Sequence, residues 1–178
     1  LEVVSERESK MQELMILRHA KAEQWYPGGE DFPRALRDVG KQHAARVAEW
    51  ICEHHYLPDE VLCSPAQRTR ETLTPLLAMR PELDSCTTFV PQIYGASTRT
   101  LVTLLDRAFA ENDRVLIVGH NPGFEMLAFE VIAPDERRKL ERLPTGTLLV
   151  IEMDSGWPDD AGRGRLAHFV RGKKLSRA

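Results

Sequence analysis

Cysteine is scarce in this 178-residue sequence, and the three that occur form no pattern. Cys52, Cys63 and Cys86 are scattered, odd in number and contain no Cys-x-x-Cys pair. A disulfide framework is therefore not predicted, and this usage is typical of reduced thiols in a cytoplasmic protein.

Long apolar runs and an excess of charge of one sign are also absent. No stretch approaches the length of a membrane span, and Leu1–Glu6 is too polar for an export signal, so we expect a cytoplasmic protein without membrane contact. The sequence has 24 lysines and arginines and 27 aspartates and glutamates, so its formal charge is -3, which gives no general attraction for nucleic acid. An anionic substrate must then be attracted by a local basic pocket.

Three short apolar runs, each followed by a polar turn, are the most informative feature that is present. Such runs predict buried strands. In an open α/β sheet, ligands bind beyond the carboxyl ends of the strands, so side chains in the three turns should converge there. The runs are Leu14–Leu17, Val61–Cys63 and Val115–Val118.

The turns after these runs carry two arginines and two histidines. Arg18 and Arg68 offer planar groups of donors that match phosphate oxygens, and His120 can donate a hydrogen bond to the same oxygens. A neutral His19 has a lone pair available to attack phosphorus. The four residues predict a site for phosphoryl transfer, and phosphate or sulfate should occupy it. Their positive charge would repel a cation, so we expect no metal and no cofactor.

Two Xaa-Pro pairs next to these turns predict helix starts. Ser64-Pro65 and Asn121-Pro122 each place a good N-cap residue before a proline. The helix N-termini would then add backbone donors for an anion, with Ser64 and Asn121 among the substrate-binding residues. Lys21 is a further candidate to bind or steer the anion.

The remaining pattern alternates helix and strand and predicts one three-layer α/β/α domain over residues 11–178, after a frayed segment of residues 1–10. The central sheet should be mostly parallel, with an antiparallel edge pair or hairpin at the C-terminal end. We expect a monomer. Helices are predicted at 40–55, 65–79, 100–109, 123–132 and 134–143, and further strands at 88–90, 147–153 and 166–170.

The chain resembles the histidine phosphatase superfamily in three motifs that occur in the expected order. The Tyr94–Ser97 segment and the residues of the first motif are most similar to bacterial phosphohistidine phosphatases of the SixA type. The motifs are Arg18-His19-Ala20-Lys21, then Ser64, Arg68 and Thr72 spaced by four, then Gly119-His120. The resemblance implies His19 as a nucleophile that forms a covalent phosphohistidine, with Arg18, Arg68 and His120 around the phosphate.

One departure from the broader superfamily bears on the substrate. Members similar to phosphomutases carry an acidic residue as general acid, but the matching stretch, Phe89–Ser97, has no carboxylate. The 80–101 segment is also too short for the helical cap of such members, which predicts an open site. Phosphohistidine expels an imidazole and needs little acid assistance, whereas an alkyl phosphate expels an alkoxide. Glu23, Glu71 and Glu125 are possible substitute acids.

The expected substrate is therefore phosphohistidine on a partner protein, such as a histidine-containing phosphotransfer domain or a phosphocarrier. Two alternatives stay open. One is a phosphatase of small phosphate esters or nucleotides. The other is a module that recognises a phosphorylated partner without turnover, although binding alone would not require a nucleophile at His19.

Overall fold

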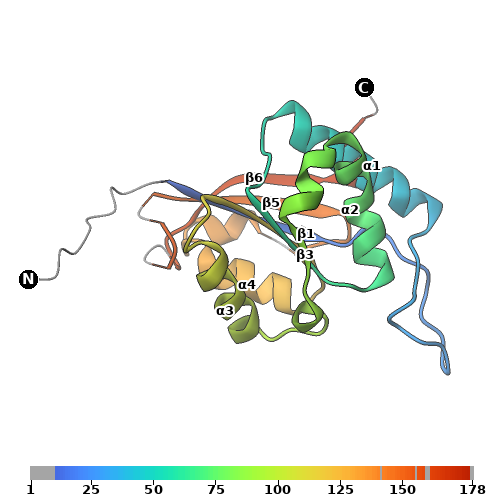
Figure 1. The fold of residues 1–178 in the computed structure, drawn as a ribbon. Coiled ribbons are helices and arrows are strands. Elements are labelled where there is room, and N and C mark those ends of the chain that lie inside the picture. The colour runs from blue at the N-terminus through green and yellow to red at the C-terminus, as the bar shows by residue number, and fades with distance from the viewer. Residues whose placement is uncertain (1–10, 141, 155, 159–160, 177–178) are drawn as a thin grey trace, which may run out of the picture.

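A computed structural model describes residues 11–140, 142–154, 156–158 and 161–176 of the chain (Figure 1). The predicted frayed segment, residues 1–10, lies outside the described residues. The strands are β1 (Gln12–Arg18), β2 (Glu60–Cys63), β3 (Thr87–Phe89), β4 (Arg114–Gly119), β5 (Thr147–Met153) and β6 (Arg165–Arg171). The α-helices are α1 (Asp38–Glu53), α2 (Gln67–Met79), α3 (Thr98–Ala108) and α4 (Gly123–Val131).

The six strands form one sheet in the order β3-β2-β4-β1-β5-β6. β1 and β2 both run parallel to β4, and β3 runs parallel to β2. β5 is antiparallel to β1 and β6 is antiparallel to β5. The predicted α/β class, the mostly parallel sheet and the antiparallel C-terminal pair are confirmed.

Helices cover both faces of the sheet, with α1 and α2 on one side and α3 and α4 on the other (Figure 1). This explains why β1 is a continuous apolar run and not an alternating one. Leu14 and Ile16 pack into the core under α3 and α4, whereas Met15 and Leu17 pack under α1 and α2. None of the helices in the described part of the chain is long and apolar enough to cross a membrane.

The segment between α2 and α3 contains β3 and two short 3₁₀ turns, η1 (Pro81–Cys86) and η2 (Pro91–Ile93). No helical cap is inserted there. The carboxyl ends of the parallel strands are therefore left uncovered from this side, in agreement with the short spacing in the sequence.

The helix predicted at 134–143 is wrong. Among the described residues of this segment, only a 3₁₀ turn, η3 (Glu136–Lys139), forms. Leu140 and Leu143 are buried, but the charged run before them offers no apolar face of helical period. Leu143 also precedes Pro144, and a residue in that position avoids the α conformation.

The predicted N-caps are also wrong. α2 begins at Gln67 and α4 at Gly123, and neither helix has a side-chain cap hydrogen bond. The Ser64 hydroxyl instead hydrogen-bonds the ring of His120, at 2.9 Å. The Asn121 amide donates to the Glu125 carboxylate and to the carbonyl of Leu143. Each cap candidate is therefore engaged by a tertiary partner.

Candidate active site

The turn after β1 is held in place from three directions. The His19 amide donates to the Gly119 carbonyl at the end of β4 (3.0 Å), and the Gly146 amide donates to the His19 carbonyl (2.9 Å). On the third side, α1 approaches so closely that a Cβ on Gly40 would lie 2.1 Å from the Lys21 carbonyl oxygen. Glycine at this position is what lets α1 pack against the turn.

The Ser64, Arg68 and Thr72 motif joins α2 to the same turn. Residues four apart lie on one face of a helix. The Thr72 hydroxyl donates to the Arg68 carbonyl (2.6 Å) and accepts a hydrogen bond from the Ala20 amide (3.0 Å). Thr72 belongs to the motif but is not a predicted site residue, and its spacing of four from Arg68 is the sequence signal for its position.

The two histidines meet at the carboxyl ends of β1 and β4. Their ring centroids are 5.3 Å apart, with the ring planes tilted by 55°. The Nδ1 atom of His19 lies 2.8 Å from the Ala20 carbonyl oxygen. Because a carbonyl oxygen can only accept, Nδ1 carries the proton in the neutral ring, and the lone pair is on Nε2.

Both rings are neutral at physiological pH. Burial lowers the pKa of His19 to about 4, and the positive charges of Arg68, Arg18 and Arg34 act in the same direction, although the hydrogen bond to Ala20 opposes them. Burial lowers the pKa of His120 to about 3, assisted by Arg68. A neutral ring keeps its lone pair, which a nucleophile requires.

Arg18 is half-buried at the end of β1. Its Nη1 donates to the Leu143 carbonyl (2.6 Å), and burial lowers its pKa while the Glu125 carboxylate opposes that effect. Glu125 itself accepts hydrogen bonds from the Leu143 amide and from Asn121, both at 3.0 Å. Asn121 and Glu125 therefore hold the backbone segment to which Arg18 is bound.

Arg68 is buried, with its side chain 5% exposed, and Asp31 holds it. Arg68 Nη1 donates to the Asp31 carbonyl (2.8 Å), and Nη2 donates to its carboxylate (2.9 Å). The Tyr94 hydroxyl and Arg34 also donate to this carboxylate, at 2.6 and 2.8 Å. Burial alone would raise the pKa of Asp31, but these hydrogen bonds lower it well below its usual range.

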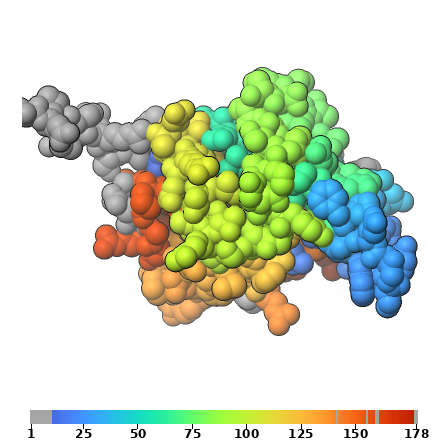
Figure 2. Space-filling model, turned by 60° about the horizontal axis from the view of Figure 1, so that its bottom comes forward, coloured from blue at the N-terminus to red at the C-terminus, as the bar shows by residue number. Residues whose placement is uncertain are grey.

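Asp31 and Tyr94 were not among the predicted site residues. Both belong to segments without regular periodicity, residues 22–36 and 90–97, which lie together because Phe32 and Tyr94 pack edge to face at 5.1 Å. Residues 22–36, in blue, project beside this second segment at one edge of the molecule (Figure 2). No local sequence signal links an acidic loop residue to an arginine 37 positions later.

An open cavity of about 570 Å³ lies in front of His19 and Arg18. Lys21 is exposed at its mouth, and Glu23 and Arg34 line it further out. The predicted residues Arg18, His19, Arg68, Ser64 and His120 are thus brought together, whereas Lys21 lies at the rim and the Asn121 amide is directed away. In the described part of the chain, no group of three or more His, Cys, Asp or Glu residues is placed to hold a metal ion.

Two of the three possible substitute acids are hydrogen-bonded as acceptors. Glu71 accepts from the Leu36 amide (2.6 Å) and from Gln67 (2.9 Å). Glu125 accepts from Asn121 and Leu143, as described above. Only Glu23 is exposed at the cavity.

Comparison with known proteins gives relatives over most of the chain. A crystal structure of a candidate phosphohistidine phosphatase SixA from Agrobacterium tumefaciens is 30% identical, covers 89% of this chain and 97% of its own, and superposes with a TM-score of 0.78. An uncharacterized protein of Mycobacterium tuberculosis is 29% identical over 150 residues, which are 80% of this chain and 90% of that protein.

A structure of the protein histidine phosphatase SixA complexed with tungstate shares the fold, with a TM-score of 0.76 at 21% identity, and covers 93% of this chain and all of its own. The sequence model of the histidine phosphatase superfamily (branch 1) matches residues 14–87, which contain the Arg-His turn and the Ser64 to Thr72 segment. With the arrangement of the two histidines and two arginines, these findings show that the chain belongs to the histidine phosphatase superfamily, branch 1.

Proposed function

We propose that this chain is a phosphatase in which Nε2 of His19 attacks phosphorus and forms a transient phosphohistidine. The observation that carries the proposal is the hydrogen bond from Nδ1 of His19 to the Ala20 carbonyl in a ring whose pKa is lowered to about 4. It leaves an unprotonated Nε2 beside Arg18 and Arg68, which is the arrangement that a nucleophile at phosphorus requires.

In the first step the Nε2 lone pair forms a bond to phosphorus while the bond to the leaving group breaks. In the second step water attacks phosphorus, Nε2 leaves, and inorganic phosphate is released. Arg18, Arg68 and His120 stabilise the charge on the phosphoryl oxygens. Nε of each arginine and Nδ1 of His120 are buried donors without a partner among the described residues, and phosphoryl oxygens would supply acceptors.

Ser64 acts through His120 as a positioning residue. The Ala66 amide lies 3.4 Å from the Ser64 hydroxyl oxygen, which leaves the hydroxyl proton free to point at Nε2 of His120. That assignment places the imidazole proton on Nδ1, ready to be donated to the phosphoryl group. Asn121 positions the Leu143 segment, and Lys21 attracts the anion from the rim.

The substrate that fits this site best is phosphohistidine on a partner protein. Expulsion of an imidazole needs little help, because its nitrogen is readily protonated near neutral pH. The carboxylates of Asp31, Glu71 and Glu125 are all engaged as hydrogen-bond acceptors, which makes them poor proton donors to an alkoxide. An open cavity also accommodates a side chain that projects from a protein surface. Tungstate bound to a protein histidine phosphatase of the same fold supports an oxyanion pocket.

Trapping the intermediate tests the nucleophile. The protein is mixed briefly with a phosphodonor, quenched without acid because the P–N bond is acid-labile, and analysed by peptide mass spectrometry. We expect the added phosphoryl group on His19. Label on another residue, or turnover without any label in rapid-quench experiments, would refute the assignment.

Substrate order tests the class. We expect kcat/KM to decrease from a phosphohistidine-bearing phosphotransfer domain, through an aryl phosphate, to a sugar phosphate. If the sugar phosphate is the better substrate, the second candidate function, a small-ester phosphatase with the exposed Glu23 as acid, takes its place. Activity should also survive EDTA, and a loss that magnesium restores would contradict the metal-independent mechanism.

A further inference from the structure

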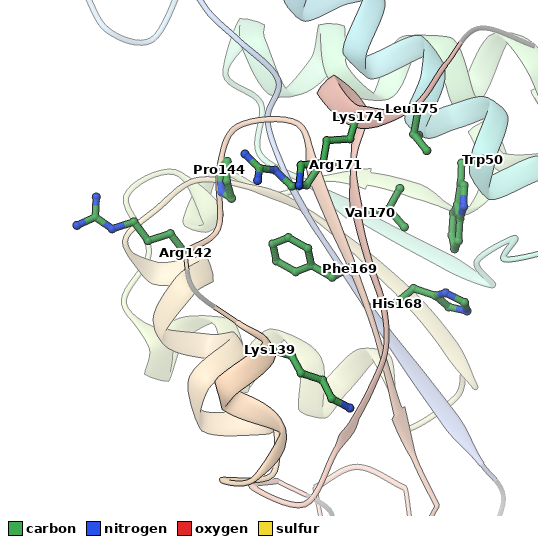
Figure 3. Close-up of a pocket in the computed structure, with 10 residues that line it drawn as sticks. All are labelled: Trp50, Lys139, Arg142, Pro144, His168, Phe169, Val170, Arg171, Lys174 and Leu175. Carbon is green, nitrogen blue, oxygen red and sulfur yellow. The ribbon is translucent and has the colours of Figure 1, made fainter.

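A second concave surface lies along the β6 edge of the sheet, and it is larger than the cavity at His19. We name it the β6 groove; its volume is about 810 Å³. Phe169 lies at the centre of its lining, and three further apolar residues, Trp50, Val170 and Leu175, lie along one side (Figure 3). Its basic lining residues are Lys139, Arg142, His168, Arg171 and Lys174, and none of the described residues that line it carries a carboxylate.

Within the described residues, most cations of the β6 groove have no carboxylate partner. Lys139 is paired with Glu136. Arg142, Arg171 and Lys174 form no ion pair with any carboxylate in the described ranges of the chain. In a protein with a net charge of -3, such a concentration of positive charge on one surface favours an acidic ligand.

A third cavity links the β6 groove to the active site, because it shares lining residues with both. This cavity of about 340 Å³ shares Pro144 and Arg171 with the groove, and it shares Lys21 and Thr145 with the cavity in front of His19. The backbone also joins the two regions, because Gly146 donates to the His19 carbonyl and accepts from the Gly172 amide, each at 2.9 Å. A ligand that extends from His19 along this path would meet Lys21, Lys173 and then the groove.

The groove follows an edge strand, which favours a polypeptide as its ligand. β6 ends the sheet and, within the described residues, pairs with β5 as its only neighbouring strand. Four consecutive residues, His168–Arg171, line the groove, and consecutive side chains of a strand point to opposite faces, so the groove runs along the strand edge. An extended chain can pair with backbone groups there, which the backbone of a nucleic acid cannot imitate.

We propose that the β6 groove docks an acidic, extended segment of the phosphorylated protein whose phosphohistidine enters the cavity at His19. This proposal rests on the proposed function above. It assigns the recognition of the partner to cations outside the reacting site and attributes the attraction to Arg142, Arg171, Lys173 and Lys174.

The test uses two peptides that each contain one phosphohistidine next to a run of identical residues. The run consists of glutamates in one peptide and of the same number of glutamines, at the same positions, in the other. We expect the parent protein to favour the glutamate peptide about tenfold in KM, since several exposed charge pairs add modest contributions. The double variant Arg142→Glu with Lys174→Glu should lose this preference. Hydrolysis of an aryl phosphate should be the same in both proteins.

A matched control reverses two exposed charges on α3, Arg99→Glu with Arg107→Glu, and should keep the preference for glutamate. Equal use of the two peptides by the parent, or a glutamate preference that survives in the groove variant, would overturn the proposal while leaving the phosphohistidine activity intact.

Binding without turnover separates this proposal from the proposed function. Fluorescence anisotropy of a labelled, unphosphorylated glutamate peptide should show binding that weakens with salt and is lost in the groove variant. If neither phosphopeptide is hydrolysed but this binding is found, the docking surface stands and the phosphohistidine assignment fails. A labelled oligothymidylate that binds the groove more tightly than the glutamate peptide would refute the choice of a polypeptide.

Discussion

Two basic regions of this molecule use positive charge in different ways. At the carboxyl ends of β1 and β4, the guanidinium groups of Arg18 and Arg68 are partly or fully buried and hydrogen-bonded to the protein. In the β6 groove, the side chains of Arg142 and Lys174 are exposed, and that of Lys139 is 60% exposed.

Burial therefore decides what a cation can do. Buried, fixed charges act through a medium of low dielectric constant. Here burial of the two histidines lowers their pKa values, and the arginine charges add to that effect. Exposed charges are screened by salt and lose side-chain freedom on binding, so each contributes little and only a group of them gives selectivity. Four variants or conditions test this contrast, in decreasing order of expected effect.

His19→Ala should reduce kcat by at least about 10⁴-fold with every substrate, because the nucleophile is removed. Thermal unfolding and circular dichroism should show that the fold is intact. Steady-state kinetics with an aryl phosphate measures the loss, and activity within about tenfold of the parent would rule out His19 as the nucleophile.

Arg68→Ala should reduce kcat about 10²- to 10³-fold, by analogy with the removal of one donor from an oxyanion site. Arg70→Ala is the matched control, since Arg70 lies two residues away in α2 but is exposed and stacks on Phe89 at 4.0 Å. Its kcat should stay close to that of the parent. Equal losses of kcat in the two variants would mean that any substitution in this part of α2 lowers the activity, and that the buried guanidinium of Arg68 has no special role.

The stability of the fold should decrease as the pH is lowered from about 6.5 to about 4. The pKa of His120 is lowered to about 3 in the folded protein, so below pH 6.5 the unfolded chain binds a proton that the folded protein does not. Relative to His120→Gln, the parent should lose about 3 kcal/mol of unfolding free energy across that window. Urea titrations at each pH measure the free energy of unfolding. The same pH dependence in the parent and in His120→Gln would contradict the burial of a neutral His120 ring.

Asp31→Asn should lower kcat about tenfold, because Arg68 loses the charged partner that positions it. Inorganic phosphate should inhibit this variant more strongly, since one negative charge beside the site is gone. Glu30→Gln, next to it on the exposed loop, should change neither property. Weaker phosphate inhibition together with an unchanged kcat would exclude a positioning role for Asp31.

Local sequence patterns were sufficient for much of the fold. The strands β1, β2 and β4 are short continuous apolar runs, and α1 has apolar residues at helical spacing on one face. Both patterns are visible within a few residues, so their burial could be predicted without knowing their partners. The 134–143 segment and the two helix caps could not. Ser64 and Asn121 are good N-cap residues, but their side chains bind distant partners instead. Ser64 binds the ring of His120, 56 residues away, and Asn121 binds the carbonyl of Leu143, 22 residues away.

The same distinction applies to the candidate site. Arg18, His19, Arg68 and His120 stand at strand ends or in the first turn of a helix, and that position is visible in the sequence. Asp31 and Tyr94 lie in irregular segments, and their contact with Arg68 arises because one loop folds back over α2 and packs on another.

The strands, most of the helices and the four residues with phosphoryl chemistry follow from the sequence alone, because hydrophobic pattern and residue type are local properties. The tertiary structure was needed to show which donors are engaged, how far burial lowers the pKa values of His19 and His120, and that a third cavity links the β6 groove to the cavity at His19. Those properties depend on distances between segments that are remote in the chain and on the exclusion of water, which no short window of residues encodes.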